Sequence, residues 1–162
     1  MKLLKREETH CSFLIGRRER EMLFSLLQRY PVMVAAHFRT RNPPKTDEAK
    51  QNQELLEEAL AEQQKENRKH LEQMLAENGR FIENDLGFTF RLSYFEIEWM
   101  LQVLNDIRIG SWIQLGEPDL SSPNAPPLNE QTVLLAWAME IAALFQHSLL
   151  QAAQSAEPAE SE

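Results

Sequence analysis

Residues that could do chemistry are few and scattered in this chain of 162 residues. Four histidines are present, each in a different segment: His10, His37, His70 and His147. Such a distribution lacks the paired spacing of metal ligands. A di-iron bundle would need a Glu-x-x-His step on facing helices, whereas Glu66 and His70 are four residues apart. We therefore expect neither a metal nor a cofactor.

Neither the single cysteine nor the five glycines stand in a recognisable catalytic motif. Cys11 would act as a nucleophile only if a histidine approached it in space, and beside Phe13 in an apolar strand we expect a packed core thiol. The glycines are too scattered to build a phosphate-cradling loop or a nucleophile elbow. No catalytic residues can be assigned on this pattern.

Arg108 is the residue with the most unusual predicted position. At about 100° per residue, Arg108 falls in the middle of an apolar side formed by Ile97, Leu101, Leu104, Trp112 and Leu115. A guanidinium buried without a partner is costly, so we expect Arg108 either to form a structural ion pair or to open onto an anion. Asn105 and Asp106 lie on the opposite arc and join Arg108 as candidate ligand-binding residues, with solvated polar positions or bonds to neighbouring helices as the alternatives.

A second candidate site is a basic loop around two adjacent prolines, Pro43-Pro44. Its cationic side chains are His37, Arg39, Arg41 and Lys45. This group would bind phosphate or an acidic partner. The alternative is a solvated loop beside the acidic helix that follows it.

The first forty residues predict two short strands and then helical segments. Leu3-Leu4 and residues 11–15 lack helical spacing and indicate a small hairpin. Apolar residues recur at helical spacing from Arg17 and predict a helix that ends near Pro31. Residues 32–38 predict a second, short helical segment.

Thr46 is an N-cap candidate for the longest predicted helix, which runs to Asn78-Gly79. Its apolar residues form two clusters, Leu55, Leu56, Ala59 and Leu60, and then Leu71, Met74 and Leu75. About ten mostly polar residues around Gln63 and Asn67 separate them, which argues against a self-standing coiled coil. We expect both ends of this helix to pack on the body and its centre to face water.

The C-terminal half predicts one strand and two helices. Residues 88–92 alternate as in a strand, and Ser93 with Glu96 matches a capping box that opens a helix ending near Leu115. A proline-rich connector, 123–127, precedes a last apolar helix over 129–151, and an acidic tail over 155–162 is expected to be disordered. The sequence thus predicts one mainly α domain, 1–154, with a small N-terminal β-hairpin or short strands and about four helices in a bundle.

Charge is unevenly distributed along the chain, whose net charge is −8. Residues 1–46 hold ten Lys and Arg against four Asp and Glu, and the remainder holds seven against twenty-one. This polarity either steers a partner or attracts two parts of the fold to each other. Overall acidity argues against nucleic-acid binding, for which local contact through the basic N-terminal part is the weakest hypothesis. The lone cysteine and the charged N-terminal segment predict a cytoplasmic protein without a membrane span.

Residues 99–109 read Trp-Met-Leu-Gln-Val-Leu-Asn-Asp-Ile-Arg-Ile. This run resembles the tryptophan-leucine and leucine-asparagine-aspartate-leucine-arginine-leucine pattern of an uncharacterised bacterial family, domain of unknown function number two thousand and seventeen. Residues 90–93 resemble the strand and helix cap before that run, and residues 145–149 are similar to the family's C-terminal ending. The basic 39–45 loop and Gly110 depart from the family pattern. The resemblance implies a largely helical cytoplasmic domain without established activity, whose genes often lie near the adaptor of the Clp protease.

These patterns favour a non-catalytic interaction or regulatory domain. Its partner would be another protein or a second copy of the chain, and the family resemblance implies a link to protein quality control through Clp-type proteolysis. The alternative is a small-molecule, anion-binding domain or an unrecognised enzyme centred on Arg108.

Overall fold

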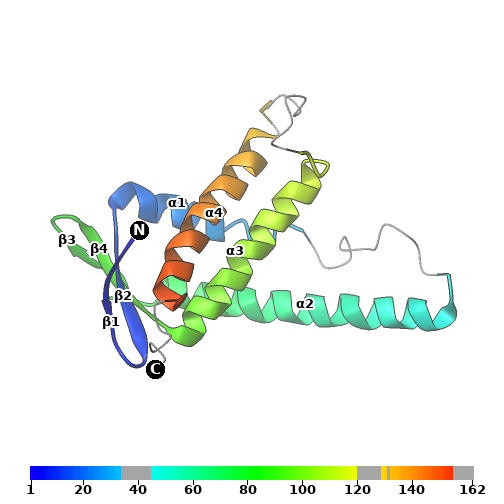
Figure 1. The fold of residues 1–162 in the computed structure, drawn as a ribbon, viewed down its shortest axis with the longest axis horizontal. Helices are drawn as coiled ribbons and strands as arrows, with labels where there is room; N and C mark the ends of the chain where they lie inside the picture. Colours follow the sequence, from blue (N-terminus) through cyan, green and yellow to red (C-terminus); the bar gives the residue numbers. More distant parts are fainter. Residues whose placement is uncertain (34–44, 120–128, 131, 155–162) are drawn as a thin grey trace, which may run out of the picture.

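The computed structural model describes residues 1–33, 45–119, 129–130 and 132–154 (Figure 1). The chain is mainly helical, as predicted, and carries one four-stranded antiparallel sheet. The elements in chain order are β1 (Lys2–Arg6), β2 (His10–Ile15), α1 (Arg17–Leu27), α2 (Asp47–Ala76), β3 (Ile82–Asn84), β4 (Gly87–Ser93), α3 (Tyr94–Gln114) and α4 (Val133–Gln154).

The sheet is larger than the predicted N-terminal hairpin, because β4 pairs with β2 and β3 pairs with β4. Side chains of β2 alternate, so that Phe13 is buried and stacks on Phe90 of β4 with ring centroids 5.5 Å apart. The three-residue strand β3 was missed because its side chains are mostly exposed and carry no alternation. Gly87 lets β4 start beside β2, since a Cβ there would lie 2.3 Å from the carbonyl oxygen of Ile15.

Helices α3 and α4 pack against each other along their lengths, and Figure 1 shows them side by side. The predicted capping box is confirmed, since Ser93 Oγ accepts from the backbone N–H of Glu96 and Glu96 accepts from the backbone N–H of Ser93. Gly116 follows the end of α3 with φ +85°, as expected for a helix terminator. Reciprocal bonds between Asn129 and Thr132 cap the start of α4.

By length and composition alone, residues 133–153 of α4 form the one described helix that is apolar enough to cross a membrane. The same helix contributes a row of buried side chains to the core: Ala138, Ala142, Phe145, Leu149 and Ala152. These contacts lie against α3, α1 and β1.

Several predicted segments lie outside the described residues: most of the 32–38 segment, the loop residues His37, Arg39 and Arg41, the 123–127 connector and the 155–162 tail. Within the described part, α1 ends at Leu27 and residues 31–33 are not helical. The close helix contacts are those of α4 with α3 and α1, and a bundle of about four helices is not shown.

The prediction that both ends of α2 pack and its centre faces water was wrong. The stripe that faces the body recurs every three or four residues and is polar in the middle of the helix, where Gln64 and Asn67 are buried. Apolar packing begins at Leu71 and Met74. Towards the other end, residues 47–63 form a segment that we call the arm. Its last residue, Gln63, donates to Gln102 of α3 at 3.2 Å, and from there the arm extends beyond the other described elements in Figure 1.

Two leucines of the arm are exposed, Leu55 at 64% and Leu56 at 50%. At about 100° per residue, Leu55 lies roughly 160° away from Leu71, on the other side of the helix from the packed stripe. Leu56, eighteen residues before Met74, falls on the same side of the helix as Met74, but only the C-terminal cluster contains residues buried in the core.

We expect Leu71→Ala to lower the free energy of unfolding by about 2–4 kcal/mol, because it removes buried methyl groups and leaves a cavity. Leu55→Ala, the matched change in the arm, is expected to alter it by less than about 0.5 kcal/mol. Urea unfolding followed by circular dichroism measures both. Equal effects at the two positions would contradict the division of α2 into a packed half and an exposed arm.

Candidate functional site

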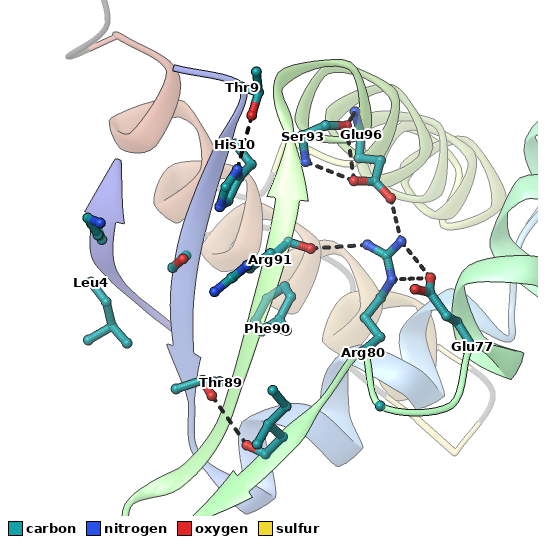
Figure 2. A pocket seen from close by; sticks show the side chains of 14 residues that line it. Leu4, Thr9, His10, Glu77, Arg80, Thr89, Phe90, Arg91, Ser93 and Glu96 are labelled. Atoms are coloured by element: carbon teal, nitrogen blue, oxygen red, sulfur yellow. Dashed lines mark hydrogen bonds and ion pairs between the residues drawn. The ribbon is translucent and has the colours of Figure 1, made fainter. Parts of the chain in front are cut away.

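Arg80 joins three elements through one guanidinium group. Its Nε donates to the carboxylate of Glu77, just after α2, at 2.7 Å, and its NH2 pairs with Glu96 in the first turn of α3 at 2.7 Å. Its NH1 donates to the backbone carbonyl of Arg91 in β4 at 3.0 Å. Figure 2 shows the guanidinium between the two carboxylates, which we call the Arg80 bridge. The bridge fixes the end of α2, β4 and the start of α3 around one cation.

The surroundings of Glu96 and Arg80 favour the charged forms of these two side chains. Burial alone would raise the pKa of Glu96, but hydrogen bonds from Ser93 and Arg80 outweigh it and lower that pKa below its usual value. Burial likewise opposes the charge of Arg80, but the bonds that Arg80 donates to Glu96 and Glu77 outweigh it and raise the pKa of Arg80. Only 16% of the Arg80 side chain and 26% of the Glu96 side chain are exposed, so water screens the pair weakly.

A hollow of about 780 Å³ lies on one side of the Arg80 bridge, over the face of the sheet shown in Figure 2. Lys5, His10 and Arg91 line it together with Arg80, Glu77 and Glu96. Arg80 pairs with both of these carboxylates and Lys5 pairs with Glu7, so most of the positive charge in the lining is already paired. The hollow has the size of a ligand pocket but lacks the convergent charge that would select an anion.

At the rim of this hollow, Glu7 in the turn after β1 pairs with His10, the first residue of β2. Glu7 lies 2.6 Å from His10 Nε2 and 2.5 Å from Lys5 Nζ, and the hydroxyl of Thr9 lies 3.1 Å from His10 Nδ1. The bond from Lys5 lowers the pKa of Glu7. The order of carboxylate, imidazole and hydroxyl is that of a hydrolytic triad. Thr9 is exposed in a tight turn and Lys5 competes for the carboxylate, so we interpret the group as a stabilised turn.

A second hollow, of about 650 Å³, lies on the other side of the bridge between the end of α2 and the start of α3. His70, Phe95 and Trp99 line it, and the His70 ring meets the Trp99 ring edge to face at 6.0 Å. The indole Nε1 of Trp99 is buried and has no hydrogen-bond partner within the described part of the chain. Because this N–H group is buried, a ligand in the hollow could not reach it.

Tyr30, Asn67 and Asp106 form a polar cluster that joins α2 and α3. The hydroxyl of Tyr30 accepts from Asn67 Nδ2 at 3.2 Å and donates to Asp106 Oδ2 at 3.4 Å. Burial is the main cause that raises the pKa of Tyr30 to about 12, and it also raises the pKa of Asp106, which the bond from Tyr30 offsets only in part. Asp106 thus bonds to the segment after α1, whereas the sequence left a neighbouring helix or water as its alternatives.

Arg108 is exposed, which corrects its predicted place in the middle of a buried face. Its NH1 donates to Oε1 of Gln146 in α4 at 3.1 Å, and Gln146 in turn donates to the carbonyl of Leu101. The prediction failed because α3 is apolar around most of its circumference. Placing its residues at 100° intervals therefore does not distinguish one buried face. Met100, Val103 and Ile107, which were not among the residues of the predicted apolar side, are buried.

The structure does not bring the three candidate ligand residues together. Arg108 bonds to α4, whereas Asp106 bonds to Tyr30 on the other side, and Asn105, which precedes Asp106, is half-buried. Of the basic loop, only Lys45 is described, and it is exposed. Within residues 1–33, 45–119, 129–130 and 132–154, no group of three His, Cys, Asp or Glu side chains could hold a metal ion.

The arm is the surface that the sequence alone did not single out. Six acidic residues, Asp47, Glu48, Glu54, Glu57, Glu58 and Glu62, stand against one lysine, Lys50. Acidic side chains and two exposed leucines therefore share one helical segment. The composition was visible in the sequence, but the exposure of Leu55 and Leu56 was not, because their spacing also fits a packed helix.

Comparison with known proteins returns no match: no family model, no curated protein and no solved structure is significantly similar to the chain.

The Arg80 bridge predicts a specific acid sensitivity. Because the folded-state pKa of Glu96 is lowered, its contribution to stability is present above the unfolded value near 4.5 and is lost as the pH falls through the folded value. We expect Glu96→Gln to lower the free energy of unfolding at pH 7 by about 1–2 kcal/mol and to flatten its decline at acidic pH.

Glu98→Gln changes an exposed residue two positions away on α3 and is the control. It should leave the free energy of unfolding at pH 7, and its decline at acidic pH, near those of the unmodified chain. Urea titrations across the acidic range measure the profiles. An unchanged slope in the Glu96 variant would show that this carboxylate is not the group that titrates.

The Tyr30 cluster predicts the opposite sign for Asp106. Its folded-state pKa is raised, so the folded chain binds the extra proton and stability decreases as the pH rises from about 3.8 through the folded value. Asp106→Asn keeps an oxygen that accepts from Tyr30 and is expected to raise the free energy of unfolding at pH 7 by up to about 1 kcal/mol. A loss of similar size in urea unfolding would mean that the charged bond to Tyr30 outweighs the cost of burial.

Proposed function

We propose that this protein is a non-catalytic interaction domain whose arm, residues 47–63, contacts a partner protein. The observation that carries the proposal is the exposure of Leu55 and Leu56 on a helix that is anchored to the body at its other end. Adjacent large apolar side chains exposed to water are typical of sites of protein contact. A compact body behind the arm fixes its position.

The hydrogen bonds of α2 favour a partner-binding role over a folding role for the arm. Gln64 donates to the carbonyl of Met33 at 2.9 Å, and Asn67 bonds to Tyr30. Both contacts lie just beyond the arm, so the helix is fixed before the exposed leucines begin. Nothing in the core depends on these two leucines, which leaves them available for another molecule.

A role in protein quality control, in the cytoplasm and beside Clp-type proteolysis, is part of the proposal. It is supported by the resemblance of residues 99–109 to the uncharacterised bacterial family. The alternative centred on Arg108 has lost its main support, because that side chain is exposed and bonds to Gln146.

Site-specific photo-crosslinking in the native host tests the proposal. A benzophenone amino acid at position 55 is expected to give a discrete crosslinked adduct, because an apolar contact surface holds its partner within reach. The same probe at Glu21, an exposed position on α1, is the matched control and should give none.

A companion Leu56→Ser change should weaken the adduct at position 55 without unfolding the chain. Identical adduct patterns at positions 55 and 21, or no adduct at 55, would contradict an interaction role for the arm.

A further inference from the structure

The leucines of the arm lie in a narrow stripe bordered by acidic side chains. At about 100° per residue, Leu55, Ala59 and Leu56 fall within an arc of roughly 100°. Glu58 and Glu62 follow on the Leu55 side of that arc, and Leu56, at its other edge, has the same angular position as the buried Met74. A partner that covers the leucines therefore meets carboxylates along one edge.

Only part of this negative charge is paired with a cation within the described residues. Lys50 pairs with Asp47 at 3.0 Å, and Lys65 pairs with Glu62 at 3.3 Å. All four side chains are exposed, so each ion pair contributes little to stability. Glu54 and Glu58 form no ion pair within residues 1–33, 45–119, 129–130 and 132–154. The arm presents a net negative field along its whole length.

We propose that the arm binds a basic amphipathic helix, which would place apolar side chains on Leu55 and Leu56 and Lys or Arg beside Glu54 and Glu58. This inference rests on the proposed function and specifies the chemistry of the partner. An arm about 25 Å long, at 1.5 Å per residue, matches a helix of four to five turns. Helix against helix is the packing that a single exposed apolar stripe favours.

Charge decides between this partner and others. Opposite charge beside an apolar stripe accelerates association and rejects wrong partners, whereas an anionic surface such as nucleic acid or acidic lipid would be repelled. A second copy of the arm is acidic too, so pairing arm to arm would place like charges together. The C-terminal half of α2 is closer to neutral, with Lys65, Arg68 and Lys69 among its charges, and antiparallel pairing of two copies is a separate outcome of the test.

Fluorescence anisotropy with the full chain and two labelled synthetic peptides tests the partner's chemistry. One peptide is an amphipathic helix of leucine and lysine about as long as the arm, and the other replaces every lysine by glutamate. We expect the lysine peptide to bind at least ~10-fold more tightly than the glutamate peptide and to weaken as salt rises from about 0.05 to 0.5 M.

Variants separate the arm from general attraction to an acidic protein. We expect L55S/L56S and E54Q/E58Q/E62Q each to weaken binding of the lysine peptide by about 10-fold. The first is matched by L134S/L144S, which removes two exposed leucines of α4, and the second by E8Q/E21Q/E98Q, which removes three exposed charges elsewhere. Both controls should change affinity by less than about 2-fold.

Equal losses in the arm variants and their controls would overturn the proposal, as would tighter binding of the glutamate peptide. So would a crosslink from position 55 to a second copy of the chain, confirmed as a dimer by light scattering. In each of these cases the proposal of a basic helix as partner fails, but an adduct at position 55 would still support the proposed interaction function. Absence of any adduct would instead remove the proposed function itself.

Discussion

The position of α2 depends on a few hydrogen bonds between the polar middle of that helix and the segment after α1. Gln64 donates to the carbonyl of Met33, and Asn67 donates to the hydroxyl of Tyr30, which in turn donates to Asp106. Both amide side chains are buried, so loss of either partner would leave an unpaired polar group at a cost of about 1–3 kcal/mol. Together with Leu71 and the Arg80 bridge, these bonds set where the helix leaves the body.

Once the C-terminal half is held, the arm needs no packing of its own to be helical. Its residues are mostly Glu, Gln, Ala and Leu, which have high helix propensity, and the packed half removes the cost of nucleation. Local contacts such as Gln53 with Glu57 and Lys50 with Asp47 add small increments. The arm can therefore stay helical while its leucines remain exposed. That combination, rather than any catalytic group, is what the fold offers for function.

Local signals in the sequence predicted the elements better than their packing. Thr46, Ser93 with Glu96, and Gly116 mark helix ends through backbone chemistry that depends on near neighbours, and the structure confirms all three. Burial depends on distant partners. The polar centre of α2 was expected in water but bonds to Tyr30 and Met33, and Arg108 was expected in the core but lies at the surface. The periodicity of a single helix could not reveal the contacts of α2 with Tyr30 and Met33, nor the exposure of Arg108.

The same limit applies to the candidate site. Arg80 gives no signal in the sequence, because its partners Glu77, Glu96 and the carbonyl of Arg91 come from three elements. Asp106 was identified, but its bond to Tyr30 joins residues 76 positions apart.

Hydrogen exchange resolved along α2 tests most directly the claim that polar contacts at Gln64 and Asn67 divide a packed half from an exposed arm. The amides of residues 65–76 should exchange only with global unfolding, whereas those of residues 50–60 should exchange through local opening at a much lower free energy. The step should fall at the polar contacts. Uniform protection from one end of α2 to the other would contradict this account and would mean that the arm is packed as firmly as the rest.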